Sequence, residues 1–247
     1  MTLLLTGLEN IQKAQKFRIN RLMKINNEKI WSPLSEGPYC VLHWLPISKK
    51  ALFGPDNLNS MEVSKFIRMK GNKSARPNLD GIRFYSSEKD EAQENTMFGD
   101  TGNISRYFWN AQIFFSGALE IAFALSFQVD SAKVKRIPQG ALLNELWDVM
   151  DGFREYMLSC NMTDPIIVGV SLLRASNCGF YISNNLRFAG LSPESDRDLI
   201  ILPEKKIESL QEMQNIEDIE LPIFNMLWRS FGLPKCEYYD DNGKRVS

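Results

Sequence analysis

The segment from Gly37 to Ser48 constrains the fold of this chain more than any other. Its residues, GPYCVLHWLPIS, open with a turn signal, continue through aliphatic and aromatic residues and end just after Pro46. A run of this kind, bounded by Gly and Pro, predicts a β-strand. Because the run is almost entirely apolar, we expect protein on both of its faces. The rest of the chain must then supply a covering layer on each side of this strand.

The composition is typical of a globular protein with one large domain or two small ones. Of the 247 residues, 44% are hydrophobic and 24% are charged, so disorder is not expected. The formal net charge is −1, whereas nucleic-acid-binding domains are usually strongly basic, so only a local basic face stays open. No apolar run is long enough to cross a bilayer, and the first eight residues lack the basic leader of a signal peptide. We therefore expect no membrane partner.

The cysteines and the single histidine restrict the chemistry that the chain can perform. The four cysteines are far apart and form no CxxC pair, which disfavours a zinc site or a disulfide framework and predicts reduced thiols in the cytoplasm. No phosphate-binding glycine loop and no nucleophile-elbow pattern is found, so we expect no cofactor. The cysteines are Cys40, Cys160, Cys178 and Cys236, and the histidine is His43.

A helix is expected over Leu8 to Asn27, where apolar residues recur at helical spacing. Arg18 interrupts the apolar stripe and is expected to reach a carboxylate or to extend toward water. Lys13, Lys16 and Lys24 lie on the other face of this helix. They form either a phosphate-contacting strip or an ordinary solvated face, and the second interpretation is favoured because exposed lysines are common.

The remaining elements predict an α+β fold. Strands come in clusters and do not alternate strictly with helices, which favours one domain with an antiparallel-rich mixed sheet packed by a long amphipathic helix. We divide the chain into an N-terminal connector helix at 1–30 and an α+β domain at 31–247. The expected strands are Ile82–Tyr85, Tyr107–Phe115, Ala118–Gln128, Ile166–Leu173, Phe180–Ile182 and Asp198–Leu202; the expected helices are Asn57–Met69, Gln139–Asn161 and Leu221–Phe231; the main loops are Asn72–Pro77, Ser86–Asn103 and Asp130–Pro138.

Three residues are the candidates for catalysis. His43 alternates with Leu42 and Trp44, so it points to the opposite face of the strand, where it is either a general base or a buried, neutral histidine bonded to a carboxylate or to the backbone. Asp80 and Glu120 could serve a Mg²⁺-dependent nuclease, but no metal-binding spacing supports this. The favoured interpretation is structural, with Glu120 paired to Arg83 or Arg106. Whether the protein is an enzyme stays open, and the balance is against it.

Aromatic residues gather on two of the expected strands and are flanked by Arg83 and Arg106. Such rings stack unpaired bases in some proteins, so the stretch 107–115, with Tyr107, Trp109 and Phe115, is a candidate contact for single-stranded nucleic acid. Core packing is the commoner role of aromatic residues in strands, and a sheet face open to a protein partner lies between the two interpretations.

Five segments together resemble the C-terminal region of bacterial proteins whose N-terminal half is an AlbA-like domain of the Schlafen type, assigned to DNA binding. At the position of Phe115 the family has a basic residue, which suggests a buried or partner-facing surface here. The segments are IQKAQKFRINRL (Ile11–Leu22), VLHWLPIS (Val41–Ser48), NLDGIRFYS (Asn78–Ser86), QIFFSGALE (Gln112–Glu120) and LWRSFGLPKCEYYDDNGKRV (Leu227–Val246).

The resemblance implies an accessory role in transcription regulation or in defence against phage. The nucleic-acid chemistry of the family is assigned to its N-terminal domain, so no catalytic residue is carried over to this sequence. The chain begins where that domain would end, as a fragment or as a stand-alone companion. We expect a non-catalytic sensing or assembly module that associates with itself or with a partner that binds DNA or hydrolyses ATP.

Overall fold

The computed structural model describes residues 2–29, 34–47, 59–71, 73–86, 89–91, 105–163, 165–182, 190–211, 213 and 215–246. The helices are α1 (Thr2–Asn26), α2 (Ser60–Ser64), α3 (Gln139–Ser159) and α4 (Glu217–Arg229). The strands are β1 (Tyr39–Pro46), β2 (Lys73–Asn78), β3 (Gly81–Ser86), β4 (Lys89–Glu91), β5 (Ser105–Tyr107), β6 (Trp109–Phe114), β7 (Leu119–Ala124), β8 (Gln128–Val129), β9 (Lys135–Pro138), β10 (Ile166–Leu173), β11 (Cys178–Ile182), β12 (Gly190–Leu191), β13 (Leu199–Ile201) and β14 (Lys205–Ile207).

The main sheet is antiparallel, and β1 is one of its interior strands. Its strand order is β13-β10-β1-β7-β6-β3-β2, and β14 also pairs with β10. β1 pairs with β10 on one side and with β7 on the other. The α+β class, the antiparallel-rich sheet and the burial of β1 on both faces are confirmed, since every β1 residue from Tyr39 to Leu45 is buried.

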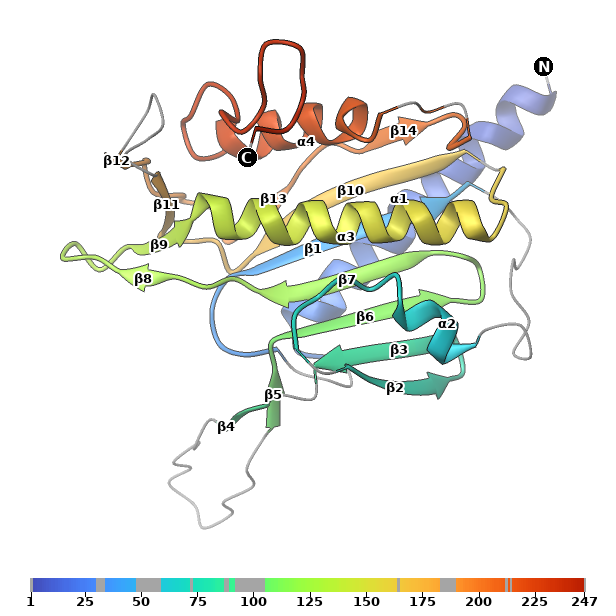
Figure 1. Ribbon diagram of the computed structural model, residues 1–247, viewed down its shortest axis with the longest axis horizontal. Helices are drawn as coiled ribbons and strands as arrows, with labels where there is room; N and C mark the ends of the chain where they lie inside the picture. Colours follow the sequence, from blue (N-terminus) through green and yellow to red (C-terminus); the bar gives the residue numbers. More distant parts are fainter. Residues whose placement is uncertain are drawn as a thin grey trace.

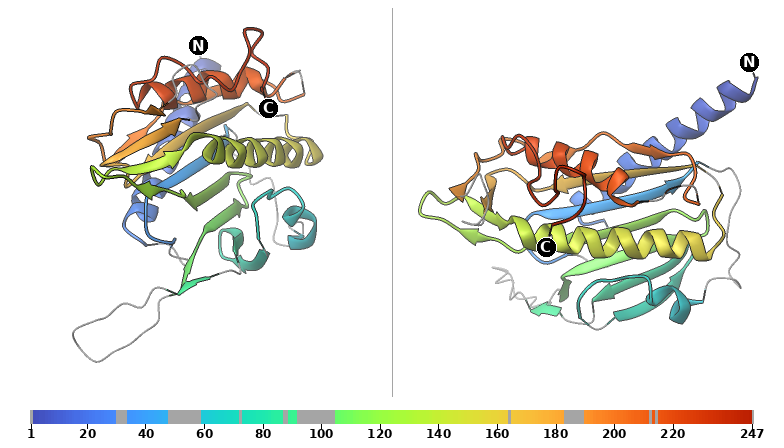
Figure 2. Two further views of the ribbon diagram at one scale, coloured as in Figure 1. Left: turned by 60° about the vertical axis from the view of Figure 1, so that its left-hand side comes forward. Right: turned by 45° about the horizontal axis from the view of Figure 1, so that its top comes forward.

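Helices cover both faces of this sheet, as Figures 1 and 2 show. α3 and α4 lie on one face, where the large core gathers the apolar side chains of β1, β3, β6, β7 and β10. α1 crosses the other face diagonally and covers two small apolar clusters. One cluster includes Leu22 and Ile25 of α1, and the other includes Leu45 and Phe114, with Phe17 packed against it. Polar residues lie between the two clusters, and they define the candidate site described below.

Two smaller sheets complete the fold. One has the order β12-β11-β9-β8 and contains the parallel pair β9–β11, and the other is the pair β4–β5. Both lie at the margin of the main sheet (Figure 1).

Several boundaries differ from those expected. β2 occupies most of the predicted loop Asn72–Pro77, and β9 lies within the predicted linker Asp130–Pro138. Both are short polar strands, so their periodicity carried no signal. α1 begins at Thr2, and its residues from Ile11 onward pack on the sheet, so the predicted connector also contributes to the core. Most of the predicted loop Ser86–Asn103 lies outside the described residues.

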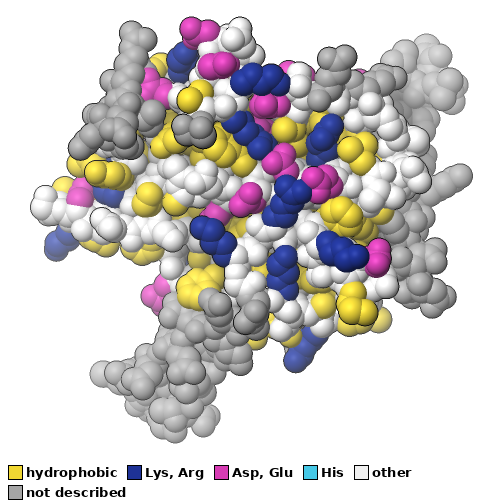
Figure 3. All heavy atoms as spheres, viewed as in Figure 1, with side chains coloured by type: hydrophobic (Ala, Val, Ile, Leu, Met, Phe, Trp, Pro, Cys, Tyr) yellow, Lys and Arg dark blue, Asp and Glu magenta, His cyan; other side chains and the backbone are white. Residues whose placement is uncertain are grey.

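The face covered by α3 and α4 carries interspersed basic and acidic side chains (Figure 3). α3 carries four carboxylates, Glu145, Asp148, Asp151 and Glu155, which do not converge on one site. Asp151 binds Arg245, and Glu155 binds Arg68. Glu145 lines a separate cavity of about 200 Å³, where burial raises its pKa to about 7. The acidic side of α3 is therefore partly a set of ion pairs.

Gly152 of α3 lies close against the backbone of the segment that follows α2. A Cβ atom at position 152 would lie 2.0 Å from the carbonyl oxygen of Phe66. We expect Gly152→Ala to destabilise the fold by about 1–3 kcal/mol through overpacking, although alanine is the better helix former. Urea unfolding measures this. Gly140→Ala in the same helix is the control, because its Cβ would meet only the Tyr238 hydroxyl at 3.2 Å. An equal or higher stability for Gly152→Ala would contradict the contact.

Candidate functional site

A row of residues in register crosses the face of the main sheet on which α1 lies. Neighbouring strands place these residues directly opposite one another, so their side chains leave the same face. α1 covers the first half of the row; in the second half Gln112 is also buried, whereas Arg83 is partly exposed and Arg76 is exposed. In strand order from β10 to β2 the row is Gly169, His43, Glu120, Gln112, Arg83 and Arg76.

Glu120 is the centre of the covered half. Its Oε2 accepts a hydrogen bond from Arg21 Nε at 2.8 Å and its Oε1 accepts one from Arg21 Nη2 at 2.6 Å, which makes the pair bidentate. His43 Nε2 lies 3.0 Å from Oε2 of the same carboxylate. His43 is fully buried and Glu120 is 1% exposed. The expected buried histidine bonded to a carboxylate is confirmed, whereas the expected partner of Glu120, Arg83 or Arg106, is corrected to Arg21.

Arg18 fixes α1 to the sheet next to this group. Its guanidinium is fully buried and donates to the carbonyl oxygens of Val170 (2.7 Å) and Leu202 (3.1 Å). It also donates to Ser171 Oγ at 2.7 Å and to Glu204 Oε1 at 2.8 Å. The guanidinium lies over Gly169, where a Cβ atom would come within 2.5 Å of Arg18 Cζ. Of the two expected outcomes for Arg18, contact with a carboxylate is confirmed.

Burial and the neighbouring charges determine the protonation states of Glu120 and His43. Burial raises the pKa of Glu120, but the hydrogen bonds from Arg21 and His43 outweigh it and lower the pKa to about 2. Burial lowers the pKa of His43, the bond to Glu120 raises it, and the charges of Arg18 and Arg21 lower it again, so the net direction is down. His43 is therefore neutral and Glu120 ionised at pH 7. The Nδ1 atom of His43 is buried and has no partner among the described residues, which fits an imidazole that donates through Nε2.

The three predicted catalytic candidates do not form an open site. His43 and Glu120 are in contact, but both lie beneath α1. Asp80 is exposed in the turn between β2 and β3, and among the described residues its side chain makes no hydrogen bond or ion pair. No group of three His, Cys, Asp or Glu side chains that could hold a metal ion occurs in the part of the chain that the structure describes. The arrangement suits a structural lock between α1 and the sheet.

The predicted aromatic surface is largely internal. Trp109 is 2% exposed, points toward α3 and donates its indole N–H to the carbonyl oxygen of Lys70, so it is not free to stack a base. Phe115 packs against the large core. Tyr107 is half-buried and forms an edge-to-face pair with Tyr85, with ring centroids 5.1 Å apart. The side chain of Arg106 lies outside the described residues.

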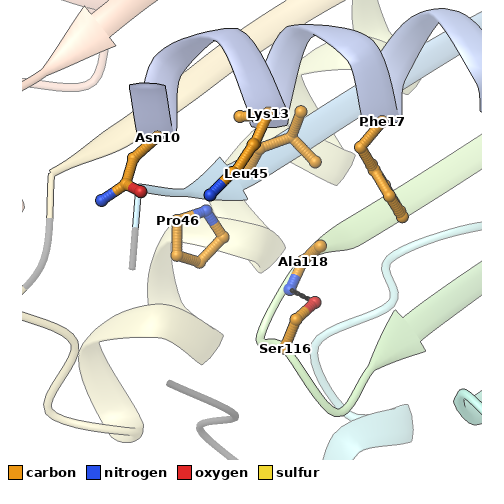
Figure 4. A pocket seen from close by; sticks show the side chains of 8 residues that line it. Asn10, Lys13, Phe17, Leu45, Pro46, Ser116 and Ala118 are labelled. Carbon is orange, nitrogen blue, oxygen red and sulfur yellow. Dashed lines mark hydrogen bonds between the residues drawn. The ribbon is translucent and has the colours of Figure 1, made fainter. Parts of the chain in front are cut away.

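The predicted lysine strip lies on the solvent side of α1. Lys13, Lys16 and Lys24 are all exposed, as expected. Lys13 lies at the rim of a groove of about 470 Å³ between the N-terminal half of α1 and the end of the sheet, which Figure 4 shows. The walls of the groove are mainly apolar. They are formed by Ala14 and Phe17 of α1, Leu45 and Pro46 of β1, and Ala118 at the turn between β6 and β7, together with Asn10 and Ser116.

Several residues of the row and of the helix contacts that cover it were not singled out from the sequence, among them Arg21, Glu204 and Arg76. Arg21 and Glu204 are ordinary surface residues by sequence pattern, and Arg76 lies in the predicted loop. A partial signal existed, because the apolar stripe of α1 is interrupted by Arg18 and Arg21 at the positions that should face the sheet. Two arginines on a buried helix face require carboxylate or carbonyl partners.

Comparison with known proteins adds no relative. The chain matches no family model, no curated protein and no solved structure. Among the described residues, none of the helices has both the length and the apolarity that crossing a bilayer requires.

Proposed function

We propose that this protein is a non-enzymatic assembly module that associates with a second copy of itself through the N-terminal half of α1. The observation that carries the proposal is the position of this half-helix. It projects beyond the main sheet (Figures 1 and 2), and the apolar groove lies directly beside its root.

The sequence of α1 supports this role. The stripe that contacts the sheet, with Ile11, Ala14, Leu22 and Ile25, continues in the sequence at helical spacing to Leu4 and Leu8. A helix end with an apolar stripe and an adjacent apolar groove form a self-complementary pair. A two-fold axis would place the projecting helix of each copy in the groove of the other, as in an isologous dimer.

The lock described above supplies the rigidity that such a module needs. Arg18 and Arg21 hold the central turns of α1 against β10, β1 and β7, so the projecting end keeps a fixed direction relative to the sheet. Following the family resemblance, we place the module in a Schlafen/AlbA-type system of transcription regulation or phage defence. A cytoplasmic location is part of the proposal and is supported by the four free thiols.

The mass of the purified chain tests the proposal. Light scattering after gel filtration should give a dimer at micromolar concentrations. Leu4→Glu with Leu8→Glu should weaken dimerisation at least about 100-fold, because burying unpaired carboxylates in an apolar interface costs several kcal/mol. Gln12→Glu with Asn20→Glu adds the same charge to the exposed side of α1 and should leave the dimer intact.

Two results would contradict self-association. One is a monomer at every concentration, and the other is an equal loss of dimer in both double variants. If the chain is a monomer that forms a one-to-one complex with a DNA-binding or ATP-hydrolysing protein through the same groove, then that partner, and not a second copy of the chain, binds in the groove. Circular dichroism of each variant establishes that the fold is retained.

A further inference from the structure

We propose a second binding site, for the phosphates of single-stranded nucleic acid, on the uncovered part of the sheet face that carries α1. The site consists of Ser74, Arg76 and Asn78 of β2 with Arg83 and Tyr85 of β3, which we call the polar platform. It lies at the edge of the main sheet, on β2 and β3 (Figure 1). It shares no residue with the groove, so this proposal is independent of the self-association of α1.

The platform differs in composition from the reverse side of the same strands. Its five members are polar or tyrosine and are all at least partly exposed. The alternate residues of β3, Ile82, Phe84 and Ser86, are buried on the α3 face. An antiparallel edge with one apolar face and one polar face is common, so the polarity alone does not make a site.

The second observation is a pair of arginines that have no partner among the residues that the structure describes. Arg76 and Arg83 are directly opposite each other in the β2–β3 register. Neither makes a hydrogen bond or an ion pair with a described residue, although Arg83 is half-buried. Like charges directly opposite each other on a sheet destabilise it. A half-buried guanidinium with free donors opposite a second one is a preformed receptor for an anion that accepts from both.

The surroundings favour phosphate over a protein carboxylate. The acidic residues whose charges act on Arg83 are Glu120, which is already bound in a bidentate manner by Arg21, and Asp80, in the adjacent turn. Asn78 donates to Gln112 Oε1 at 2.8 Å and so extends the polar row without adding charge. The charge of Arg21 also acts on Arg83, which strengthens the attraction for an anion.

The shape of the site favours a strand over a small molecule. Enclosed ligands need a concave pocket, whereas the platform is a sheet face whose polar members extend over two strands. Arg76 and Arg83 would each neutralise a phosphate, and the half-buried pair of Tyr85 and Tyr107 at the end of the platform would contact a sugar or a base. The aromatic contact is thus limited to these tyrosines, because Trp109 faces the opposite layer.

Fluorescence anisotropy with a labelled single-stranded 12-nucleotide oligomer tests the site. Two phosphate contacts on a single strand predict a salt slope of about −1.4, so the affinity should fall about 7-fold between 50 and 200 mM salt. Arg76→Gln and Arg83→Gln should each weaken binding about 5-fold near 0.1 M salt, and the double variant about 25-fold. Arg68→Gln is the matched control on the α3 side, where Arg68 pairs with Glu155, and should bind like the wild type.

Competition and stability complete the test. Inorganic phosphate and a mononucleotide at 10 mM should displace little of the oligomer. Full displacement by either would show that the site binds a small phosphate compound and not a nucleic-acid strand. Without ligand, Arg76→Gln should raise the urea midpoint, because it removes the like-charge pair. No binding at 50 mM salt, an equal loss in Arg68→Gln, or a lower midpoint for Arg76→Gln would each overturn the proposal.

Discussion

Replacing Glu120 with alanine should lower the free energy of unfolding by about 3–5 kcal/mol. The substitution leaves the Arg21 guanidinium and the His43 imidazole without their shared partner, and removal of one member of a buried pair is strongly destabilising. Urea unfolding at pH 7 measures the change. The control is Glu155→Ala, which removes a carboxylate from the surface pair with Arg68, and should change stability by less than about 1 kcal/mol.

The same residue makes stability depend on pH. The pKa of Glu120 is lowered to about 2 from its ordinary value of 4.5, so its contribution is fully present above about pH 4.5 and is lost as the pH falls toward 2. A shift of this size corresponds to about 3 kcal/mol. The pKa of His43 is also lowered, from 6.5. The stability contributed by the neutral imidazole is therefore lost at a higher pH, as the pH falls below about 6.5. In the Glu120→Gln variant, most of the decrease in the free energy of unfolding below pH 4.5 should disappear. Two results would contradict the structural role of Glu120. One is an unchanged decrease in stability at acid pH in Glu120→Gln, and the other is an equal loss of unfolding free energy in Glu120→Ala and Glu155→Ala.

Replacing Arg18 with alanine should cost about 3 kcal/mol or more. The buried guanidinium satisfies two backbone carbonyls, a serine hydroxyl and Glu204, and its removal leaves these groups unpaired around a void. Gly169→Ala should cost about 2 kcal/mol by itself, because the added methyl group would come within 2.5 Å of Arg18 Cζ.

The coupling free energy between Arg18 and Gly169 shows whether the two residues are in direct contact or whether each substitution destabilises the fold independently. In the Arg18→Ala background, Gly169→Ala should cost nothing or should stabilise, because the methyl group then enters empty space. Urea unfolding of the two single variants and the double variant gives the coupling free energy. Additive effects would show that Arg18 and Gly169 do not meet, and that α1 is held against the sheet in some other way.

The central elements could be predicted because their apolar patterns are unambiguous. β1 and β10 are continuous apolar runs, and α3 has a wide apolar stripe, so burial alone determines their type and approximate limits. β2 and β14 were missed for the opposite reason. Both are short and polar, each pairs on one side only, and β2 contains Pro77, so their strand conformation comes from the neighbouring strand and not from their own residues.

The candidate site was predictable in part. Strand alternation placed His43 on the opposite face from Leu42 and Trp44, and burial implied a hydrogen-bond partner, either a carboxylate or the backbone. The choice of Arg21 as the partner of Glu120 depends on how α1 crosses the sheet, which is set by packing over many residues and leaves no local signal. The contacts of Arg18 with backbone carbonyls were hidden for the same reason, because carbonyl groups have no sequence signature.

Hydrogen exchange measured at two protein concentrations tests the central claim, that α1 is both locked to the sheet and the means of association. A helix end that contacts nothing exchanges readily, whereas a buried one is protected. Raising the concentration above the dimer dissociation constant should slow exchange at residues 2–12 and in the turn around Ser116 and Gly117, with no change in β2 and β3. Concentration-dependent protection that appears elsewhere, with residues 2–12 unaffected, would contradict the account.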